Sequence, residues 1–214
     1  MASPPRYLDP VRPGRERNPP RAAPVFASGE EEEALMAAYT RGDEGAFQRL
    51  FARLAPSVHG YFRRAVGSAA AADDLLQTTF LKLHRARLRW RAGEPVRPWL
   101  FGIAARVRAD HLRRQASRGF VVSDPDAGPE EEDPAEGPED AAAGGERAAR
   151  VRAALAALPE TQRTVVELHR YHGLSFAEIA AALHTTEGAV KLRAFRAYEG
   201  LRATLGDLVG EGEP

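Results

Sequence analysis

Hydrophobic residues recur along much of this chain at intervals of three and four, the spacing that places them on one side of a helix. Three such stripes follow one another in the first half: Phe47, Leu50, Phe51 and Leu54; then Leu75, Leu76, Phe80 and Leu83; then Leu100, Ile103, Ala104, Val107 and Leu112. Asp43 can cap the first helix, and Pro56 favours a kink or a restart within it. No segment of useful length alternates with the period of a strand. The pattern predicts an all-α protein.

The helical pattern stops in the middle of the chain and resumes near residue 149. The intervening DPDAGPEEEDPAEGPEDAAAGGE has no large apolar residue, so it cannot bury enough surface to fold. We therefore expect two small helical domains joined by a flexible acidic linker. The expected divisions are a disordered extension (1–29), an N-terminal domain (30–116), an acidic disordered linker (117–148), a C-terminal domain (149–206) and a flexible tail (207–214).

The stretch SFAEIAAALHTTEGAVKLRAFRA predicts two short helices joined by a tight turn. Ser175 and Glu178 have the spacing of a capping box, and Thr185 or Thr186 can cap the second helix. The expected buried face of that helix consists of Val190, Ala194, Ala197 and Leu201. Its expected outward face consists of Lys191, Leu192, Phe195 and Arg196. This pattern fits a DNA-binding helix-turn-helix, but it also fits a helical hairpin whose outward residues a neighbouring helix covers.

The net charge of zero hides a strong segregation. Residues 34–118 hold 16 basic and 6 acidic residues, whereas residues 119–148 hold 1 basic and 10 acidic ones. The first block could attract a polyanion, and the acidic tract could repel or mimic one. Ordinary solvated helix faces and a solubilising spacer are the simpler interpretations.

The composition excludes several classes of function. The absence of cysteine excludes disulfides, cysteine-ligated zinc and thiol catalysis, and no apolar run approaches the length of a membrane helix. His169 and His172 are three residues apart on a helix, but no third metal ligand is evident. We find neither a glycine-rich phosphate loop nor a paired nucleophile and base. We expect a cytoplasmic protein that is not an enzyme, with no cofactor, no metal and no small-molecule substrate.

Two sets of motifs resemble bacterial RNA polymerase sigma factors of the extracytoplasmic-function (ECF) type. LPETQRTVVELHRYHGLSFAEIAAALHTTEGAVKLRAFRAYEGLR is similar to the family's C-terminal promoter-recognition domain. ADDLLQTTFLKLHRAR resembles its polymerase-binding helix, and RPWLFGIAARVRADHLRR resembles the helix that meets the opened promoter. The resemblance covers roughly residues 34–116 and 149–205, in the family's order.

The resemblance implies three groups of binding residues. The upstream promoter element would be bound by Thr185, Thr186, Glu187, Lys191, Leu192, Arg193, Phe195 and Arg196. The melted element would be bound by Trp90, Arg91, Arg97, Trp99, Arg106, Arg108, Arg113 and Arg114. Core polymerase would be bound by Asp73, Asp74, Leu75, Gln77, Thr78, Phe80 and Leu81. Core packing remains the alternative for both tryptophans, and for Leu75 and Phe80.

The chain departs from the family's usual residues at four positions. His184 replaces the usual glycine of the turn, and Leu192 replaces a small polar residue of the recognition helix. Ala105 and Arg106 replace a basic residue and an asparagine of the promoter-melting helix. We expect the change at His184 to alter only the turn, and the other three to affect the preferred DNA sequence rather than the general role.

The implied partners are core RNA polymerase, promoter DNA and an anti-sigma factor, which in this family is frequently membrane-anchored. The alternative is a conventional helix-turn-helix regulator that does not bind polymerase stably and has no need for the N-terminal motifs. A third possibility is an interaction module that sequesters another factor. If two promoter elements lie about two helical turns apart, the linker must cross roughly 70 Å.

Overall fold

The computed structural model describes residues 29–66, 68–117 and 138–209, and every regular element in these ranges is a helix. The order along the chain is α1 (Gly29–Thr40), α2 (Glu44–Val66), α3 (Ala69–Ala86), a 3-10 turn (Arg87–Arg89), α4 (Val96–Ser117), α5 (Pro138–Ala157), α6 (Glu160–Arg170), α7 (Phe176–Ala182) and α8 (Glu187–Val209). The all-α prediction is confirmed. None of the described helices is both long and apolar enough to cross a membrane.

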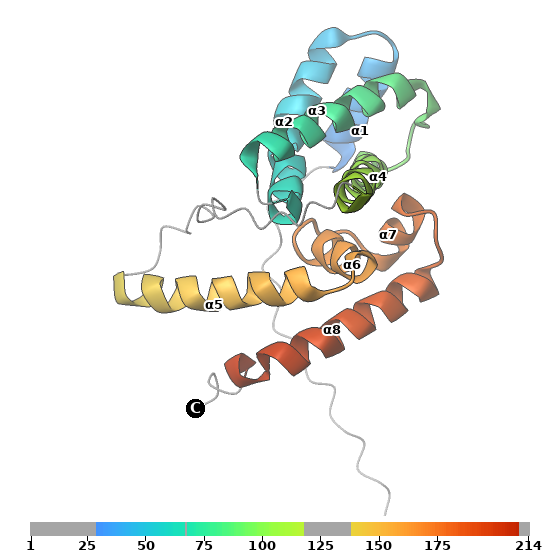
Figure 1. Ribbon diagram of the computed structural model, residues 1–214. Helices are drawn as coiled ribbons and strands as arrows, with labels where there is room; N and C mark the ends of the chain where they lie inside the picture. The colour runs from blue at the N-terminus through green and yellow to red at the C-terminus, as the bar shows by residue number, and fades with distance from the viewer. Residues whose placement is uncertain (1–28, 67, 118–137, 210–214) are drawn as a thin grey trace, which may run out of the picture.

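The N-terminal domain is a bundle of α1 to α4 (Figure 1). Asp43 caps α2 as expected, because its side chain accepts the N–H of Ala46 at 3.0 Å. The alternative of a restart at Pro56 does not occur, since α2 runs through this residue as one helix. Leu54 and Val58 on either side are fully buried, so both halves of α2 are held on the same core.

Helices α5 to α8 form the C-terminal domain, and it begins earlier than expected. Helix α5 starts at Pro138, inside the stretch predicted as a disordered linker. Pro138 occupies the helical position that proline favours, and the following residues are dominated by alanine, glutamate and arginine, which favour helix. The last turns of α5 then bury Leu155 against Val166 and Ala197. The other end is also longer, because α8 continues to Val209, three residues past the expected boundary.

The remainder of the predicted linker (118–137), the predicted extension up to residue 28 and residues 210–214 lie outside the described residues. The structure thus gives helix at Gly29, at Ser117, over 138–148 and over 207–209, where disordered or flexible segments were expected. The expected disorder of the residues outside the described ranges stays a prediction.

The two domains pack directly against each other. Helix α4 lies between the remainder of the N-terminal bundle and helices α6 and α7 (Figure 1), and its main contact in the C-terminal domain is with α7. A single buried apolar cluster spans both, with Leu100 and Phe101 from one side and Leu174 and Ile179 from the other. The domains thus share a core, which the expectation of two separate units did not include.

Candidate nucleic-acid interface

Helix α7 begins with the predicted capping box. The Ser175 hydroxyl accepts the N–H of Glu178 at 3.2 Å, and the Glu178 carboxylate accepts the N–H of Ser175 at 2.8 Å. Two backbone donors that the helix cannot satisfy are thereby paired. The reciprocal bonds therefore define the residue at which α7 starts.

The turn between α7 and α8 depends on one unusual backbone conformation. His184 has a φ of 52°, in the left-handed region that glycine adopts most readily. Its side chain is exposed, so the imidazole does not obstruct the bend. Thr186, one of the two predicted caps, starts α8 by accepting the N–H of Ala189 at 3.2 Å. Helix α8 can therefore leave the turn at a sharp angle although the turn has no glycine at residue 184.

Helix α8 divides into the two faces that its pattern predicts. Val190, Ala194 and Ala197 are at most 3 % exposed and pack on the domain core. On the opposite side Leu192 is 49 % exposed and Phe195 is 62 % exposed, so no described helix covers them. Lys191 and Arg196 are also exposed, and Lys191 pairs with Glu187 at 2.7 Å. A surface ion pair of this kind contributes little to stability and can exchange for a phosphate.

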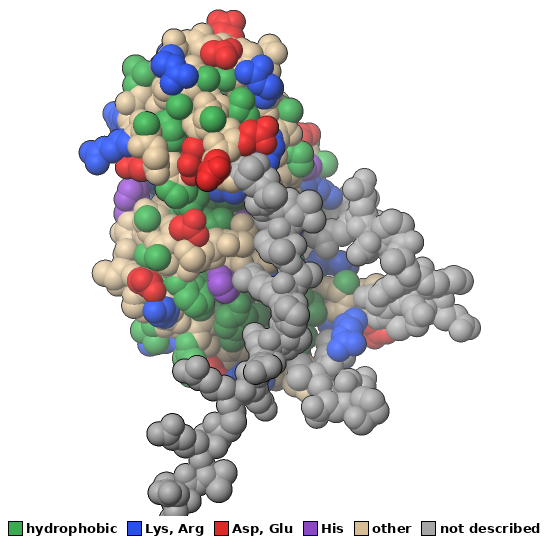
Figure 2. Space-filling model, turned by 180° about the vertical axis from the view of Figure 1, so that it is seen from behind, with side chains coloured by type: hydrophobic (Ala, Val, Ile, Leu, Met, Phe, Trp, Pro, Cys, Tyr) green, Lys and Arg blue, Asp and Glu red, His purple; other side chains and the backbone are tan. Residues whose placement is uncertain are grey.

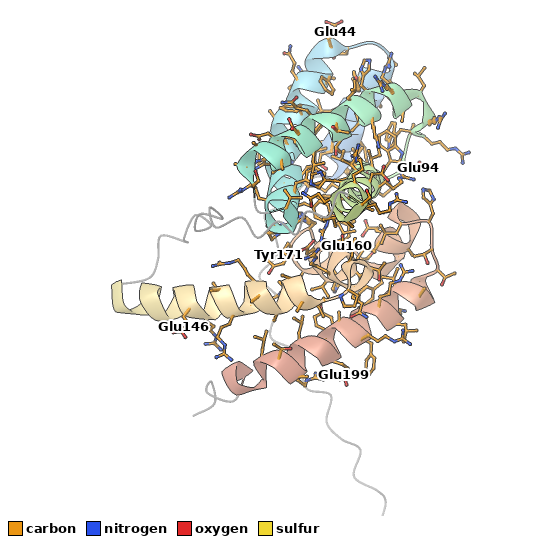
Figure 3. All side chains as sticks on the ribbon, in the orientation of Figure 1. Glu44, Glu94, Glu146, Glu160, Tyr171 and Glu199 are labelled. Carbon is orange, nitrogen blue, oxygen red and sulfur yellow. The ribbon has the colours of Figure 1, made fainter. Side chains whose placement is uncertain are left out.

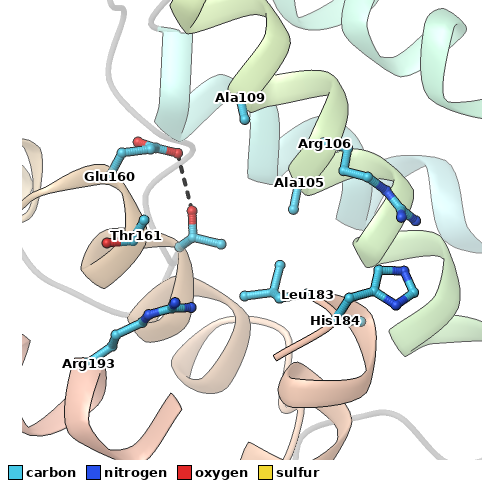
Figure 4. Close-up of a pocket in the computed structure, with 10 residues that line it drawn as sticks. Ala105, Arg106, Ala109, Glu160, Thr161, Leu183, His184 and Arg193 are labelled. Atoms are coloured by element: carbon cyan, nitrogen blue, oxygen red, sulfur yellow. Dashed lines mark hydrogen bonds between the residues drawn. The ribbon is translucent and has the colours of Figure 1, made fainter. Parts of the chain in front are cut away.

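The remaining residues predicted for the upstream element surround this face. Thr186 and Glu187 are exposed and Thr185 is half-buried. Arg193 is half-buried and lines a hollow between α4 and α6 to α8, with Arg106, Thr161 and His184 on its other walls (Figure 4). Arg193 therefore points toward the domain interface, whereas Lys191 and Arg196 point to solvent.

The residues predicted for the melted element separate into exposed and buried groups. Arg91, Arg106, Arg113 and Arg114 are exposed. Trp90 is 6 % exposed and its indole N–H donates to the Glu94 carbonyl at 3.1 Å. Trp99 is half-buried and packs against the same core. The ring of Trp90 is thus part of the domain core in this arrangement and offers no free surface for stacking on a base.

Two of the predicted DNA-binding arginines form ion pairs with buried carboxylates. The Arg97 guanidinium donates to the buried carboxylate of Glu32 at 2.5 Å, and Arg53 reaches the same oxygen at 3.1 Å. Arg108 is fully buried and forms ion pairs with Glu160, at 2.7 Å, and with Glu167. Figure 3 shows Glu160 between α4 and α6, at the boundary of the two domains. Sequence reasoning missed Glu32, Glu160 and Glu167, since no local pattern marks a carboxylate as the partner of a distant arginine.

The residues predicted for polymerase binding lie along α3, where they also separate by burial. Asp73, Asp74, Gln77 and Leu81 are exposed and Thr78 is half-buried. Leu75 and Phe80 are each 4 % exposed and belong to the core. The Phe80 ring packs edge-on against Phe51 of α2, with ring centroids 4.7 Å apart. Phe51 is itself 38 % exposed, so it adds an apolar side chain to this surface that the stripe pattern assigned to the interior.

The histidines do not converge on a metal site. His169 bonds the Leu174 carbonyl at 2.8 Å and stacks on Phe176, whereas His172 contacts Ser57 and Arg64. Among the described residues no group of three or more metal-ligating side chains comes together.

On the face seen in Figure 2, acidic and basic side chains are interspersed over the N-terminal domain.

Two domain families match the chain, Sigma-70 region 2 over residues 50–118 and Sigma-70, region 4 over residues 148–201. RNA polymerase sigma factor CarQ of Myxococcus xanthus is 38 % identical over 179 residues, which cover 81 % of this chain and 97 % of that protein. ECF RNA polymerase sigma factor SigM of Mycobacterium tuberculosis is 35 % identical over 174 residues, covering 81 % and 84 %.

A solved structure extends the similarity to the arrangement of the helices. CnrH, whose structure was solved in complex with the cytosolic domain of CnrY, superposes with a TM-score of 0.63 at 26 % identity, over 83 % of this chain and 99 % of that one. Together with the order of the two matched regions, these similarities show that the chain belongs to the RNA polymerase sigma factors of the ECF type.

Proposed function

We propose that the chain is a sigma initiation factor, which binds core RNA polymerase and directs it to specific promoters. The observation that carries the proposal is the presence of region 2 and region 4 in one chain. A conventional helix-turn-helix regulator would need the second but has no use for the first. A factor that must bind polymerase and two promoter elements needs both.

The helix-turn-helix would bind the double-stranded upstream element. In this class of motif the N-terminal half of the second helix enters the major groove. Lys191 and Arg196 flank the solvent-exposed face of α8 and are suited to a guanine edge or a phosphate. The exposed Leu192 and Phe195 between them are suited to apolar contact with thymine methyl groups.

The N-terminal domain would bind polymerase through α3 and the melted element through α4. The exposed side chains of α3 that the resemblance assigns to polymerase are Asp73, Asp74, Gln77 and Leu81. The exposed Phe51 of α2 adds apolar area where it packs on Phe80 of the same helix. The exposed Arg106 and Arg114 of α4 can follow the phosphates of an unpaired strand.

An anti-sigma factor is the third proposed partner. CnrH was solved with the cytosolic domain of CnrY bound, and its similarity extends over most of the present chain. The exposed apolar side chains Leu192 and Phe195 would be available to such a protein when DNA is absent.

The test is transcription from a promoter library by core polymerase with and without the purified chain. We expect transcripts that start at a defined subset of promoters and that require the chain. Lys191→Ala combined with Arg196→Ala should reduce these transcripts and leave binding to core polymerase intact. If the chain binds DNA alone as a dimer and gives no polymerase-dependent start sites, the regulator is the correct assignment.

A further inference from the structure

A carboxylate is buried where α1 meets α2 and α4. Glu32 of α1 is 1 % exposed. Its Oε1 accepts hydrogen bonds from Nε of Arg53 at 3.1 Å, from Nε of Arg97 at 3.1 Å and from Nη2 of Arg97 at 2.5 Å. A charge is tolerated in the interior only where such partners offset its lost hydration. One oxygen atom thus joins three helices, and it holds Arg97 by two of its nitrogens.

Packing alone does not require a carboxylate at this position of α1. The helix lies ahead of residue 50, where the match to Sigma-70 region 2 begins. Its other buried residues include Met36 and Tyr39, which are at most 6 % exposed and lie in the apolar core. Well-packed apolar residues in place of a buried ion pair often leave stability unchanged or increase it. What Glu32 adds is therefore the position that it imposes on the two arginines.

Arg97 stands at the α4 end of an exposed loop, whose other end is fixed by Trp90 (Figure 3). The Trp90 ring is buried, and its indole N–H crosses the loop to the Glu94 carbonyl at 3.1 Å. The Glu94 N–H donates to the Arg91 carbonyl at 3.0 Å, and Gly93 supplies the positive φ of 88° that the turn needs. The loop is thus held at Trp90 and at Arg97, and it presents the residues between them to solvent.

We propose that Glu32 is a positioning residue for recognition of the melted promoter element, and that it acts through Arg97 on the loop at 91–95. This inference rests on the proposed function. The Arg97 side chain is 18 % exposed and is neutralised by Glu32, so it serves the loop rather than the DNA. The exposed Arg91 is the basic side chain that the loop offers to an unpaired strand. A loop that is ordered before binding loses less conformational entropy when it binds.

The charge of Glu32 also keeps two arginines together. Arg53 pairs with Glu31 at 2.8 Å as well as with Glu32, so two carboxylates face two guanidinium groups. Glu32→Gln removes one of these carboxylates and keeps the shape of the side chain. Arg53 and Arg97 then repel each other, and Arg97 loses a charge-assisted hydrogen bond. We expect the α4 end of the loop to move as a result.

The test uses core polymerase with the full chain and two promoter libraries. One library varies the upstream element in duplex DNA, and the other varies the melted element in a preformed unpaired bubble. Glu32→Gln should reduce the preference among melted-element sequences roughly fivefold, the lower end of what loss of one base contact costs. It should leave the preference at the upstream element and the affinity for core polymerase as they are in the parent.

Glu31→Gln is the matched control. It makes the same change at the neighbouring residue, whose carboxylate is exposed and pairs with Arg53, and it should match the parent in both libraries. Arg97→Gln should reproduce the effect of Glu32→Gln while leaving Glu32 paired with Arg53, so the test does not depend on one variant folding. The double variant should lose no more preference than either single variant, because the two residues act as one unit.

The outcomes separate positioning from a structural role and from direct contact. Equal losses at both elements together with a lower unfolding temperature would reduce Glu32 to a structural residue. Unchanged melted-element preference in Glu32→Gln, or additive losses in the double variant, would also overturn the proposal. A fall of about one unit in the salt slope of Arg97→Gln would show that Arg97 contacts phosphate directly. If the parent shows no preference in either library, the proposed function itself fails.

Discussion

His172 is kept neutral by the residues that surround it. Burial is the main cause that lowers its pKa to about 3, and the positive charges of Arg64 and Arg97 add to this effect. The Arg64 guanidinium donates to Nε2, so the ring proton is on the Nδ1 that faces Ser57. The rings of Phe101 and Tyr61 occupy further sides of the imidazole. A protonated His172 would therefore face two arginines without a described carboxylate contact.

Acidification should separate the two domains, because His172 lies at their interface in contact with Ser57 and Arg64 of α2. In the open chain His172 would titrate near its ordinary pKa of 6.5, whereas in the closed chain it titrates near 3. The closed form thus has its full stability above pH 6.5 and loses it as the pH falls toward 3. Between pH 7.5 and pH 5 the ratio of open to closed chains should rise roughly 30-fold. The interdomain distance measured against pH checks this, and His172→Gln should show a weaker dependence.

At α8, Lys191 and Arg196 should differ in the kind of DNA contact they make. Loss of a contact to a base edge costs about 1–3 kcal/mol and relaxes the preference at one position, whereas loss of a phosphate contact weakens all sequences and lowers the salt slope by about one unit. Binding of the polymerase complex to a promoter library at several salt concentrations separates the two for Lys191→Ala and Arg196→Ala. No change in either variant would mean that this face does not contact DNA.

The elements differ in how much of each surface is available for binding. Helix α3 buries Leu75 and Phe80 but leaves Asp74 and Gln77 in solvent, so one helix both holds the domain together and presents a polar surface. Substitution of Leu75 or Phe80 would destabilise the core. A loss of polymerase binding could then not be attributed to a lost contact with polymerase. The exposed pair is the better probe.

Asp74→Ala combined with Gln77→Ala should weaken binding to core polymerase without unfolding the chain. Exposed positions away from caps and cores usually change stability by less than about 0.5 kcal/mol. Polymerase affinity and thermal unfolding measured together check this. Arg85→Ala on the same helix, also exposed, is the control. A folded double variant with unchanged affinity would remove the assignment of α3 to polymerase.

At the scale of the molecule, local patterns predicted the helices but not how the two domains meet. The faces of α8 follow from spacing alone, since Val190, Ala194 and Ala197 recur with the period of a helix. The pairing of Arg108 with Glu160 and Glu167 joins residues 52 and 59 positions apart. No periodicity identifies such a pair, and Arg108 was therefore expected at the melted promoter element, whereas the structure buries it. The left-handed conformation at His184 is a local matter, and the glycine that the family usually has at this turn was the signal that pointed to it.

Shortening the segment between α4 and α5 should impair promoter use more than changing its sequence. Deletion of residues 124–136 leaves a maximum reach of about 30 Å between the helix ends. That is less than the roughly 70 Å between two elements that lie two helical turns apart. Transcription from a two-element promoter should fall sharply, whereas a glycine-serine replacement of equal length should retain most of it. Normal activity of the shortened chain would exclude this role for length.

The early start of α5 shortens the segment that joins it to α4. Twenty residues separate Ser117 from Pro138, and fully extended they cover about 70 Å. If this segment alone had to cross the distance between elements two helical turns apart, it would be almost fully extended. In that case further length would come from unwinding the first turns of α5, which yields roughly 2 Å for each residue that leaves the helix. Gly144 and Gly145 make this part of the helix weak. The range of promoter spacer lengths that the chain tolerates would then depend on the free energy needed to unfold the first turns of α5.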